Sequence, residues 1–518
     1  MRNLTHAAFR FTMALVLGLA FILMYTAPLS AGGVVGDGTP ASCTEAAFVA
    51  ALANGGLVTF DCGSSPHTIV LTTSKQIALD TYIRGNGRVT LSGGNATPLF
   101  QVFHSATLVL QDIILTRGQG FYGLIENFGS LHIINSQLTN SLATGSGGAI
   151  ENYGQLVITS TLILGNKAMM AGGGIFNDGG WVTLSASQMI SNTAPIGGGL
   201  LNATNSVATV YDSQFSGNVA PDIVLANGGG ILNQGTLTLT QVFIHSNSGR
   251  RGGGLGNQGN ALLNNVTFRG NSSDGDGAGI YNIGASATLT LTQVTFSNNS
   301  AGGSGGGIGN AFGTLSLTSV TLTGNSATND GGGIDNYLGT VRLTNATISG
   351  NSSDYGAGMY NNGGDASLDF VTIADNSALH LGSLASLPGP QGQTATLRNS
   401  LVVNNASAGN CFAPTGNNQS FISGGHNLSS DATCATYLTQ PTDLNGTNPL
   451  LGPLGDNGGA TPTHVPDPGS PAIDHGQCLQ DVATDQRGVP RPQGSACDIG
   501  AVERYATLLL YVPLVVGP

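Results

Sequence analysis

The sequence has few charged and few aromatic residues. Only 8% of its 518 residues are Asp, Glu, Lys or Arg, 6% are aromatic, and a single tryptophan is present. With 15 basic against 27 acidic residues the net charge is −12, which excludes the basic face that nucleic-acid binding requires. The negative charge is spread thinly, so it indicates solubility rather than an acidic binding tail.

Cysteine is absent from the whole central part of the chain. The six cysteines lie near the two ends, at Cys43, Cys62, Cys411, Cys434, Cys478 and Cys497. An even number of cysteines is typical of disulfide-bonded exported proteins. We expect the pairs Cys43–Cys62, Cys411–Cys434 and Cys478–Cys497. Other pairings stay open, because only proximity in the sequence supports this choice.

Glycine is abundant, with 80 residues, and much of it falls in a repeat. A glycine cluster, an aliphatic residue, a variable residue and an asparagine recur at intervals of 24 to 31 residues, as in GGGIFN and GAGIYN. Degenerate copies end at Asn127 and Asn152. A period of this size is typical of a solenoid. The clear copies end at Asn177, Asn202, Asn233, Asn257, Asn282, Asn310, Asn336 and Asn361.

A second pattern keeps the same period and predicts strands. Threonine alternates with aliphatic residues and ends in asparagine, as in LTLTQVTFSNN (Leu289–Asn299) and LSLTSVTLTGN (Leu315–Asn325). Alternation with period two indicates a strand with one buried face. About 25 residues at ~3.3 Å each give room for three short strands per coil. The sequence therefore predicts an all-β, right-handed parallel β-helix with three sheets and about a dozen coils.

The recurring asparagines and glycines are interpreted as structural. Asparagines stacked in successive coils can hydrogen-bond one another through their amides, and glycine allows tight bends and close approach of neighbouring coils. Ligand contact is the alternative. The ladder interpretation directs the search for function to residues that break the pattern.

The chain divides into five predicted parts. Residues 1–31 form a signal peptide, with an uninterrupted apolar stretch at Met13–Met24, although an uncleaved anchor is an alternative. Residues 32–65 form an N-terminal cap with a helix inside Cys43–Gly56. The β-helix follows over 66–410, a loop-rich segment over 411–504 and a hydrophobic tail over 505–518. The tail is too short to span a membrane.

Two segments resemble known families. The paired motifs GG-[GA]-I-x-N and F-x-x-N, the latter at 215–218, 268–271 and 296–299, resemble the repeats of chlamydial polymorphic outer-membrane proteins over roughly residues 120–380. The segments 448–476 and 484–503 are similar to the choice-of-anchor Q domain of secreted bacterial repeat proteins. These resemblances imply an exported, surface-associated protein and offer no catalytic residues to carry over.

One edge of the predicted rod collects charged residues. In register, Arg251, Asp276, Ser304 and Asp330 stack at the position before the glycine cluster, with Asp274 and Asp354 nearby. We expect an ion pair between Arg251 and Asp276. The aspartates are candidates for a sugar or Ca²⁺ site, and solvated loop residues are the alternative. The calcium-loop pattern in SSDGDG (272–277) is incomplete, so no cofactor or metal is assigned and calcium stays open.

Other candidate sites are supported by weaker sequence patterns. Glu126 and Glu151 stack one coil apart, near the ~5 Å separation of retaining glycosidases. The histidines show no metal-ligand spacing. Arg487 and Arg491 lie in a charged C-terminal stretch, where ion pairs that hold a cap are the first interpretation and a glycan contact is the second.

The leading functional prediction is a secreted or cell-surface β-helix with an adhesive or structural role in the envelope or matrix. Its expected partner is a cell-surface or extracellular polysaccharide or protein, without nucleic acid and without a transmembrane segment after signal cleavage. The alternative is a polysaccharide lyase or glycoside hydrolase that acts on an acidic polysaccharide. No catalytic residue is assigned.

Overall fold

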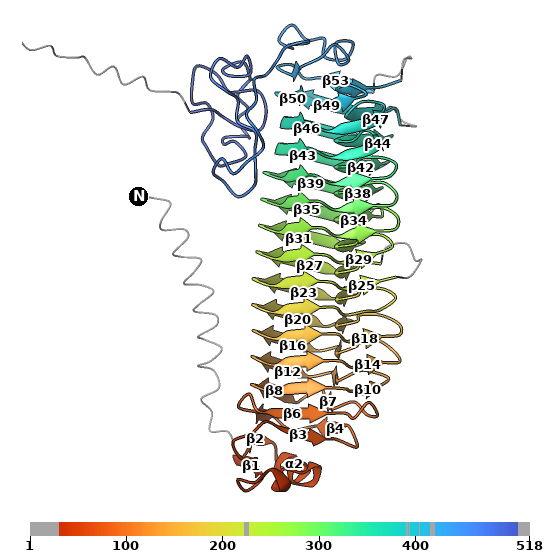
Figure 1. The fold of residues 1–518 in the computed structure, drawn as a ribbon, viewed down its shortest axis with the longest axis vertical. Helices are drawn as coiled ribbons and strands as arrows, with labels where there is room; N and C mark the ends of the chain where they lie inside the picture. The colour runs from red at the N-terminus through yellow and green to blue at the C-terminus, as the bar shows by residue number, and fades with distance from the viewer. Residues whose placement is uncertain are drawn as a thin grey trace, which may run out of the picture.

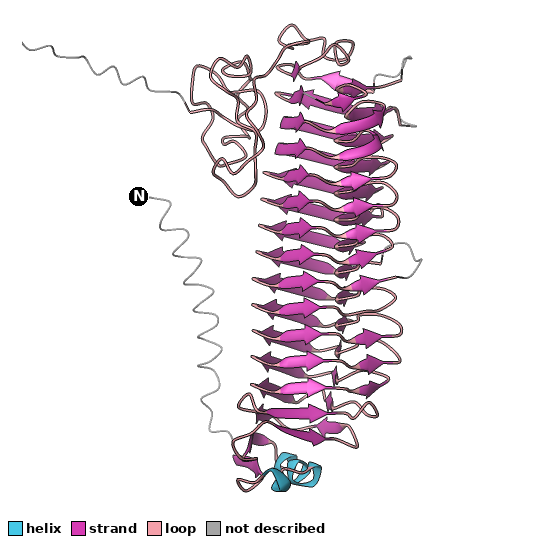
Figure 2. Ribbon diagram, in the orientation of Figure 1, coloured by secondary structure: helices cyan, strands magenta, loops and turns pink. Residues whose placement is uncertain are grey.

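The protein is a long stack of parallel β coils (Figures 1 and 2). The computed structural model describes residues 31–221, 227–389, 392, 394–403, 405–414 and 420–505. The predicted signal peptide, apart from Ala31, and the tail beyond Tyr505 lie outside these residues. The all-β parallel β-helix predicted from the sequence is confirmed.

Each typical coil contains four strands, one more than predicted. In one coil these are β35 (Thr288–Thr292), β36 (Thr295–Ser297), β37 (Ser300–Ala301) and β38 (Ile308–Ala311). Equivalent strands of successive coils pair in parallel and in register, and we call the four resulting stacks the first, second, third and fourth walls. The third wall escaped prediction because its strands have only two residues in most coils.

The walls differ in extent. The first wall begins at β1 (Ala31–Val35) and the second at β3 (His67–Val70), whereas the third begins at β10 (Gln119–Gly120). The fourth wall runs from β4 (Lys75–Ile77) to β52 (Cys411–Phe412) and has 14 strands, slightly more than the predicted dozen coils.

The stack of coils also extends beyond the expected range of 66–410. At the front, β2 (Gly56–Phe60) pairs with β5 (Thr81–Arg84). At the back, β53 (Phe421–Ser423) and β54 (Leu428–Ser429) pair with β49 (Ala395–Arg398) and β50 (Leu401–Val403). The terminal segments therefore contribute strands to the rod besides covering its ends.

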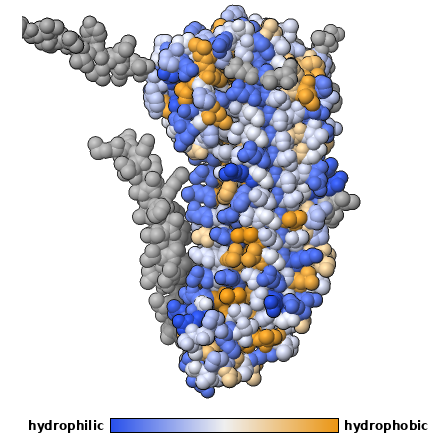
Figure 3. Space-filling model, in the orientation of Figure 1, coloured by the Kyte–Doolittle hydropathy of each residue, from blue (hydrophilic) through white to orange (hydrophobic). Residues whose placement is uncertain are grey.

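The interior follows from the alternation of residue types. In β35, Leu289 and Leu291 are fully buried while Thr288 and Thr290 point outward. The same alternation in the other coils gives one continuous apolar core along the rod. Outside, hydrophobic residues form separate patches among hydrophilic ones on the face in Figure 3.

Two asparagine ladders run through the middle coils of the core. In the first, each Nδ2 donates to the Oδ1 of the next asparagine at 2.7–2.9 Å, from Asn127 through Asn361. In the second, asparagines from Asn166 to Asn376 repeat this bond at 2.8–3.0 Å. The amides thus pair with one another inside the protein, as a stacked ladder requires.

In the coil before Asn166, the strand pattern ends at Asn140, but the second ladder begins at the next residue, Ser141. Asn140 is exposed, has a φ of 54° and takes the place of Gly165. The adjacent Ser141 occupies the ladder position and donates through Oγ to Asn166 Oδ1 at 2.6 Å. Asparagine tolerates left-handed backbone, so it substitutes for glycine at this bend.

The N-terminal end is covered by the predicted helix, α2 (Glu45–Leu52). Thr44 caps it, because its Oγ1 accepts a hydrogen bond from the Ala47 amide at 3.2 Å. Phe48 is fully buried, and its ring centre lies 6.4 Å from that of Phe100 in β7 (Phe100–Val102). The helix therefore closes the core at the first coils.

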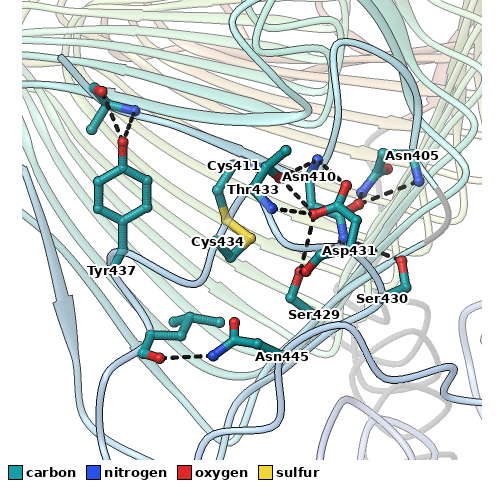
Figure 4. The surroundings of a disulfide bond; sticks show 12 residues. Asn405, Asn410, Cys411, Ser429, Ser430, Asp431, Thr433, Cys434, Tyr437 and Asn445 are labelled. Carbon is teal, nitrogen blue, oxygen red and sulfur yellow. Dashed lines mark hydrogen bonds between the residues drawn. A yellow bond between two sulfur atoms is a disulfide. The ribbon is translucent and has the colours of Figure 1, made fainter. Parts of the chain in front are cut away.

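The opposite end is closed by residues around Cys434. Cys434 and Leu438 are buried in the main core, and Tyr437 exchanges hydrogen bonds with the backbone of Ala413 at 2.8 and 3.0 Å. Figure 4 shows these contacts around the Cys411–Cys434 disulfide. All three predicted disulfides are present, and no described cysteine is free.

The rest of the C-terminal segment lies along the side of the rod, not across its end. The blue segment in Figure 1 lies beside the upper coils. Gln486 donates to Thr321 Oγ1 at 2.8 Å and accepts from Thr347 Oγ1 at 2.7 Å, while Asn399 binds the backbone of Gln477. Small polar residues on the second-wall side of the C-terminal coils thus bind this segment through hydrogen bonds.

Buried ion pairs organise the docked segment. Arg491 binds Glu503 at 2.7 Å and stacks on Phe370, with its guanidinium carbon 4.1 Å from the ring centre. Arg487 binds Asp485 at 2.8 Å. Since the side chains of Arg487 and Arg491 are 6% and 1% exposed, these arginines hold the segment in place, and the alternative of a glycan contact is wrong.

Candidate functional site

The charged edge predicted from the sequence is a column of residues on successive coils. Backbone amides of Gly252, Gly277 and Gly305 donate to the carbonyls of Asp276, Ser304 and Asp330 at 3.1, 2.9 and 2.8 Å. Because each residue before the glycine is matched to its counterpart one coil on, Arg251, Asp276, Ser304, Asp330 and Tyr355 follow one another along the rod.

Glycine is required beside this column. Gly277 has a φ of 65°, and a Cβ there would lie 2.7 Å from the Cα and Cβ of Tyr281. The chain at this bend therefore packs directly on the outward side of the fourth wall. That close contact half-buries the column.

Arg251 is the cation of the edge. Its Nε lies 3.2 Å from Asp276 Oδ2, although the N–H is not oriented for a good hydrogen bond. Its guanidinium carbon lies 5.6 Å from the ring centre of Tyr281. The side chains of Arg251 and Asp276 are 34% and 27% exposed, so both remain within reach of a ligand.

Asp276 and Asp330 are linked through Ser304. The Ser304 amide donates to Asp276 Oδ1 at 3.1 Å, and the Ser304 hydroxyl donates to Asp330 Oδ2 at 3.2 Å. Burial raises the pKa of Asp330, the Ser304 hydrogen bond opposes that rise, and the charges of Asp276 and Asp354 add to it. The two carboxylates thus sit in one hydrogen-bonded chain.

The remaining two predicted residues are placed differently. Asp354, in β44 (Ser352–Tyr355), is half-buried near enough to Asp330 to affect its pKa. Asp274 follows β33 (Ser272–Ser273), is exposed, and its carboxylate has no hydrogen bond to any described residue. Within the described ranges, no group of three or more His, Cys, Asp or Glu side chains is arranged to hold a metal ion.

Sequence analysis missed three neighbours of this edge. Asp335, Tyr281 and Tyr360 occupy the variable position of the glycine–asparagine motif, on the outward side of the fourth wall. Burial, and then the charges of Asp330 and Asp276, raise the pKa of Asp335 well above its ordinary value. Burial also raises the pKa of both tyrosines to about 12. Aligning the variable position across repeats singles out these residue types, but not their closeness to the charged column.

A second carboxylate pair lies nearer the N-terminus. Glu126 in β11 (Ile125–Asn127) and Glu151 in β15 (Ile150–Asn152) are in register on adjacent coils. Gln101 donates to Glu126 at 2.7 Å, and the Tyr153 hydroxyl donates to Glu151 Oε1 at 2.9 Å. Glu151 is 2% exposed, and its buried Oε2 has no hydrogen-bond partner among the described residues.

The environment of Glu151 favours its protonated form. Burial raises its pKa to about 7, the Tyr153 hydrogen bond opposes this, and the charges of Glu126 and Asp178 add to the rise. A carboxylic acid that keeps its proton near neutral pH is what a general acid requires. Glu151 is nevertheless enclosed, so this pair has the protonation state of a glycosidase acid but not the access.

We call the column from Arg251 to Asp330, with its neighbours Tyr281 and Tyr360, the Arg251–Asp330 edge. It offers one cation, several carboxylate oxygens and two aromatic rings, a set that can bind polar ligands.

Comparison with known proteins gives one result. The Chlamydia polymorphic membrane protein repeat matches residues 265–283, 293–311 and 319–337. Each matched stretch runs from the second wall to the fourth wall, through the second ladder and the glycine cluster. No curated protein and no solved structure matches the chain significantly. In the part of the chain that the structure describes, no helix has the length and apolarity to cross a membrane.

The chain is therefore similar, over three of its coils, to the Chlamydia polymorphic membrane protein repeat.

Proposed function

We propose that this protein acts outside the cell, at the cell surface or in the extracellular matrix, as a rod that binds or connects other surface components. The observation that carries the proposal is the regular rod itself, three of whose coils match the Chlamydia polymorphic membrane protein repeat. Three disulfides, two at the ends of the rod and one in the segment along its side, support an oxidising, extracytoplasmic location.

The shape of the rod supports a binding or structural role. A parallel stack repeats its outward side chains every ~4.8 Å, so it presents the same chemistry at many points along its length. The interior is filled by aliphatic side chains and asparagine ladders, which leaves the outer walls, turns and edges for partners.

The location is tested by labelling intact cells of the source organism with an antibody against the rod, next to an antibody against a cytoplasmic protein. The proposal expects labelling of unbroken cells, removal of the signal by external protease, and no signal from the cytoplasmic marker. Labelling that appears only after lysis would overturn it.

The enzymatic alternative has one specific observation in its favour, the Glu126–Glu151 pair, in which burial raises the pKa of Glu151 to about 7. It is tested by incubating the purified protein with a panel of acidic polysaccharides and measuring reducing ends and unsaturated products. Turnover that disappears in Glu151→Gln but persists in Asp274→Asn would establish the enzyme and contradict a purely binding rod.

A further inference from the structure

The corner between the fourth and first walls is uneven along the rod. The chain crosses it in four residues at 203–206, in two at 234–235, in two at 258–259 and in four at 284–287. Two short connections are thus flanked by two long ones. The corner is therefore notched over a width of two coils, ~10 Å.

The notch is a real hollow. It is open to solvent and has a volume of about 320 Å³, at the lower end of the range of small-molecule sites, roughly 300–1,000 Å³. Thr204 and Asn205 belong to one long connection, Ser286 to the other, and Gln234 and Gln258 come from the two short connections.

The lining of the notch is polar but carries no charged residue. Gln234 Nε2 donates to Gln258 Oε1 at 3.1 Å, so the two amides hold each other in a fixed row. Among the described residues, no partner takes the Gln258 amide hydrogens or bonds the side chain of Asn205. Uncharged donors and acceptors held apart from one another suit hydroxyl groups better than carboxylates or phosphates.

An exposed aromatic ring flanks the notch. Trp181, the single tryptophan of the chain, is 61% exposed and starts β20 (Trp181–Ser185). It is the register partner of Val207, which lines the notch one coil further along. The coils of Gln234 and Gln258 are two and three steps further along, ~10 and ~14 Å away, so the indole offers an apolar surface for one ring of a longer chain whose other rings reach the amides.

We propose that this notch binds an uncharged polysaccharide segment. Trp181 stacks on the C–H face of one sugar ring, while Gln258, Gln234 and Asn205 hydrogen-bond to sugar hydroxyls. This inference rests on the proposed extracellular function and names a ligand class for it. The site is distinct from the acidic Arg251–Asp330 edge. That edge precedes the fourth-wall strands, whereas the notch follows them.

The single tryptophan makes a direct assay available. The full chain is titrated with neutral hexasaccharides of β-linked glucose, xylose or mannose, with hexagalacturonate as the acidic comparison, and Trp181 emission is recorded. We expect at least one neutral hexasaccharide to give a saturable change in emission and to reduce quenching by acrylamide. Gln258→Ala should weaken the apparent affinity about tenfold, the loss of ~1.4 kcal/mol of hydrogen bonding.

Native electrophoresis in gels containing the corresponding neutral polymers tests the ring itself. Trp181→Ala should lose the retardation and Trp181→Phe should keep part of it. Gln188→Ala, an exposed glutamine of the second wall, is the matched control and should bind normally. The proposal is overturned if no neutral sugar changes emission or mobility, if hexagalacturonate binds better, or if binding survives both Gln258→Ala and Trp181→Ala.

These outcomes are separable from the test of location. If intact cells are labelled but the protein binds no sugar, only the proposed sugar site in the notch is contradicted. Sugar binding by a protein that intact-cell labelling places inside the cell contradicts only the proposed function.

Discussion

Each asparagine inside the first ladder, beyond its first member Asn127, acts in two directions, since its amide nitrogen donates to one neighbouring coil while its oxygen accepts from the other. Asn282, for example, donates to Asn310 at 2.7 Å and accepts from Asn257 at 2.7 Å. It is fully buried, so water cannot replace either bond.

Replacing Asn282 with alanine should destabilise the protein by about 1–3 kcal/mol, because Asn310 Oδ1 is left buried without a donor, while Asn257 Nδ2 keeps its bond to the Gly259 carbonyl. Denaturant unfolding followed by circular dichroism measures the change. Asn264→Ala, an exposed asparagine on the first wall, is the control and should shift stability by less than ~0.5 kcal/mol. Equal effects of the two substitutions would contradict the structural role of the ladder.

The pH dependence of stability should report Glu151. Its folded-state pKa of about 7 lies above the ordinary 4.5, so folding favours the protonated form. Stability from this group is therefore complete below about pH 4.5, decreases as the pH rises towards 7, and remains low above it.

Glu151→Gln should remove this decrease and stabilise the protein above pH 7 by on the order of 3 kcal/mol. Melting temperatures measured across this pH range test the prediction, with Asp274→Asn as an exposed control. Profiles of wild type and Glu151→Gln that run parallel would show that Glu151 is not the titrating group.

At the residue scale, the sequence allowed the first ladder and the Arg251–Asp276 pair to be anticipated, because both follow from counting repeats. Asp335, Tyr281 and Tyr360 were missed because only the folded bend before the glycine cluster brings the fourth wall beside the charged column. Asn140 shows a related limit, since the sequence does not distinguish an asparagine in a ladder from one at a left-handed bend.

At the scale of elements, the docked C-terminal segment depends on Arg491 and Glu503. Removing Arg491 would leave the fully buried Glu503 carboxylate without its cation, a change that costs about 3–5 kcal/mol in comparable pairs. Arg491→Ala should therefore loosen the segment while the coils stay folded, since coils depend mainly on their neighbours.

Limited digestion with chymotrypsin tests this prediction, and cleavage within residues 431–505 should become at least about tenfold faster for a loss of this size. Arg342→Ala, an exposed arginine of β43 (Thr340–Ser349), should digest like the wild type. Unchanged cleavage in Arg491→Ala would mean that the ion pair does not hold the segment.

The terminal disulfides should act locally. Cys411 and Cys434 are separated by 23 residues, so replacing both with serine should cost about 3 kcal/mol, chiefly at the late coils. Hydrogen exchange should increase in β52 and in β48 (Leu384–Leu387) but not near α2. Replacing Cys43 and Cys62 should give the reverse pattern, and equal exchange at both ends in both variants would contradict local action.

Elements with a strong period were predictable, and those without one were not. Helix α2 followed from its cap and apolar residues. The third wall could not be predicted, because two-residue strands carry no alternation. The position of the C-terminal segment depends on scattered contacts, such as Gln486 with Thr321, that no local pattern encodes.

At the scale of the whole molecule, the protein combines a rigid, repetitive interior with variation at its surface. The glycine clusters and ladders keep the coils in register, whereas turn length and outward residues change from coil to coil. The notch beside Trp181 and the Arg251–Asp330 edge are two such variations. Candidate binding features are therefore found where coils differ. Because successive coils are ~4.8 Å apart, the residues of such a feature are spaced in multiples of this distance.

We propose that the rod binds extracellular material without degrading it. The most direct test incubates the purified protein with intact cells and their extracellular polysaccharide, then measures both bound protein and released sugar ends. We expect saturable retention of the protein without any protein-dependent increase in reducing ends or unsaturated products. Release of such products in proportion to the protein added, or failure of the protein to be retained, would contradict it.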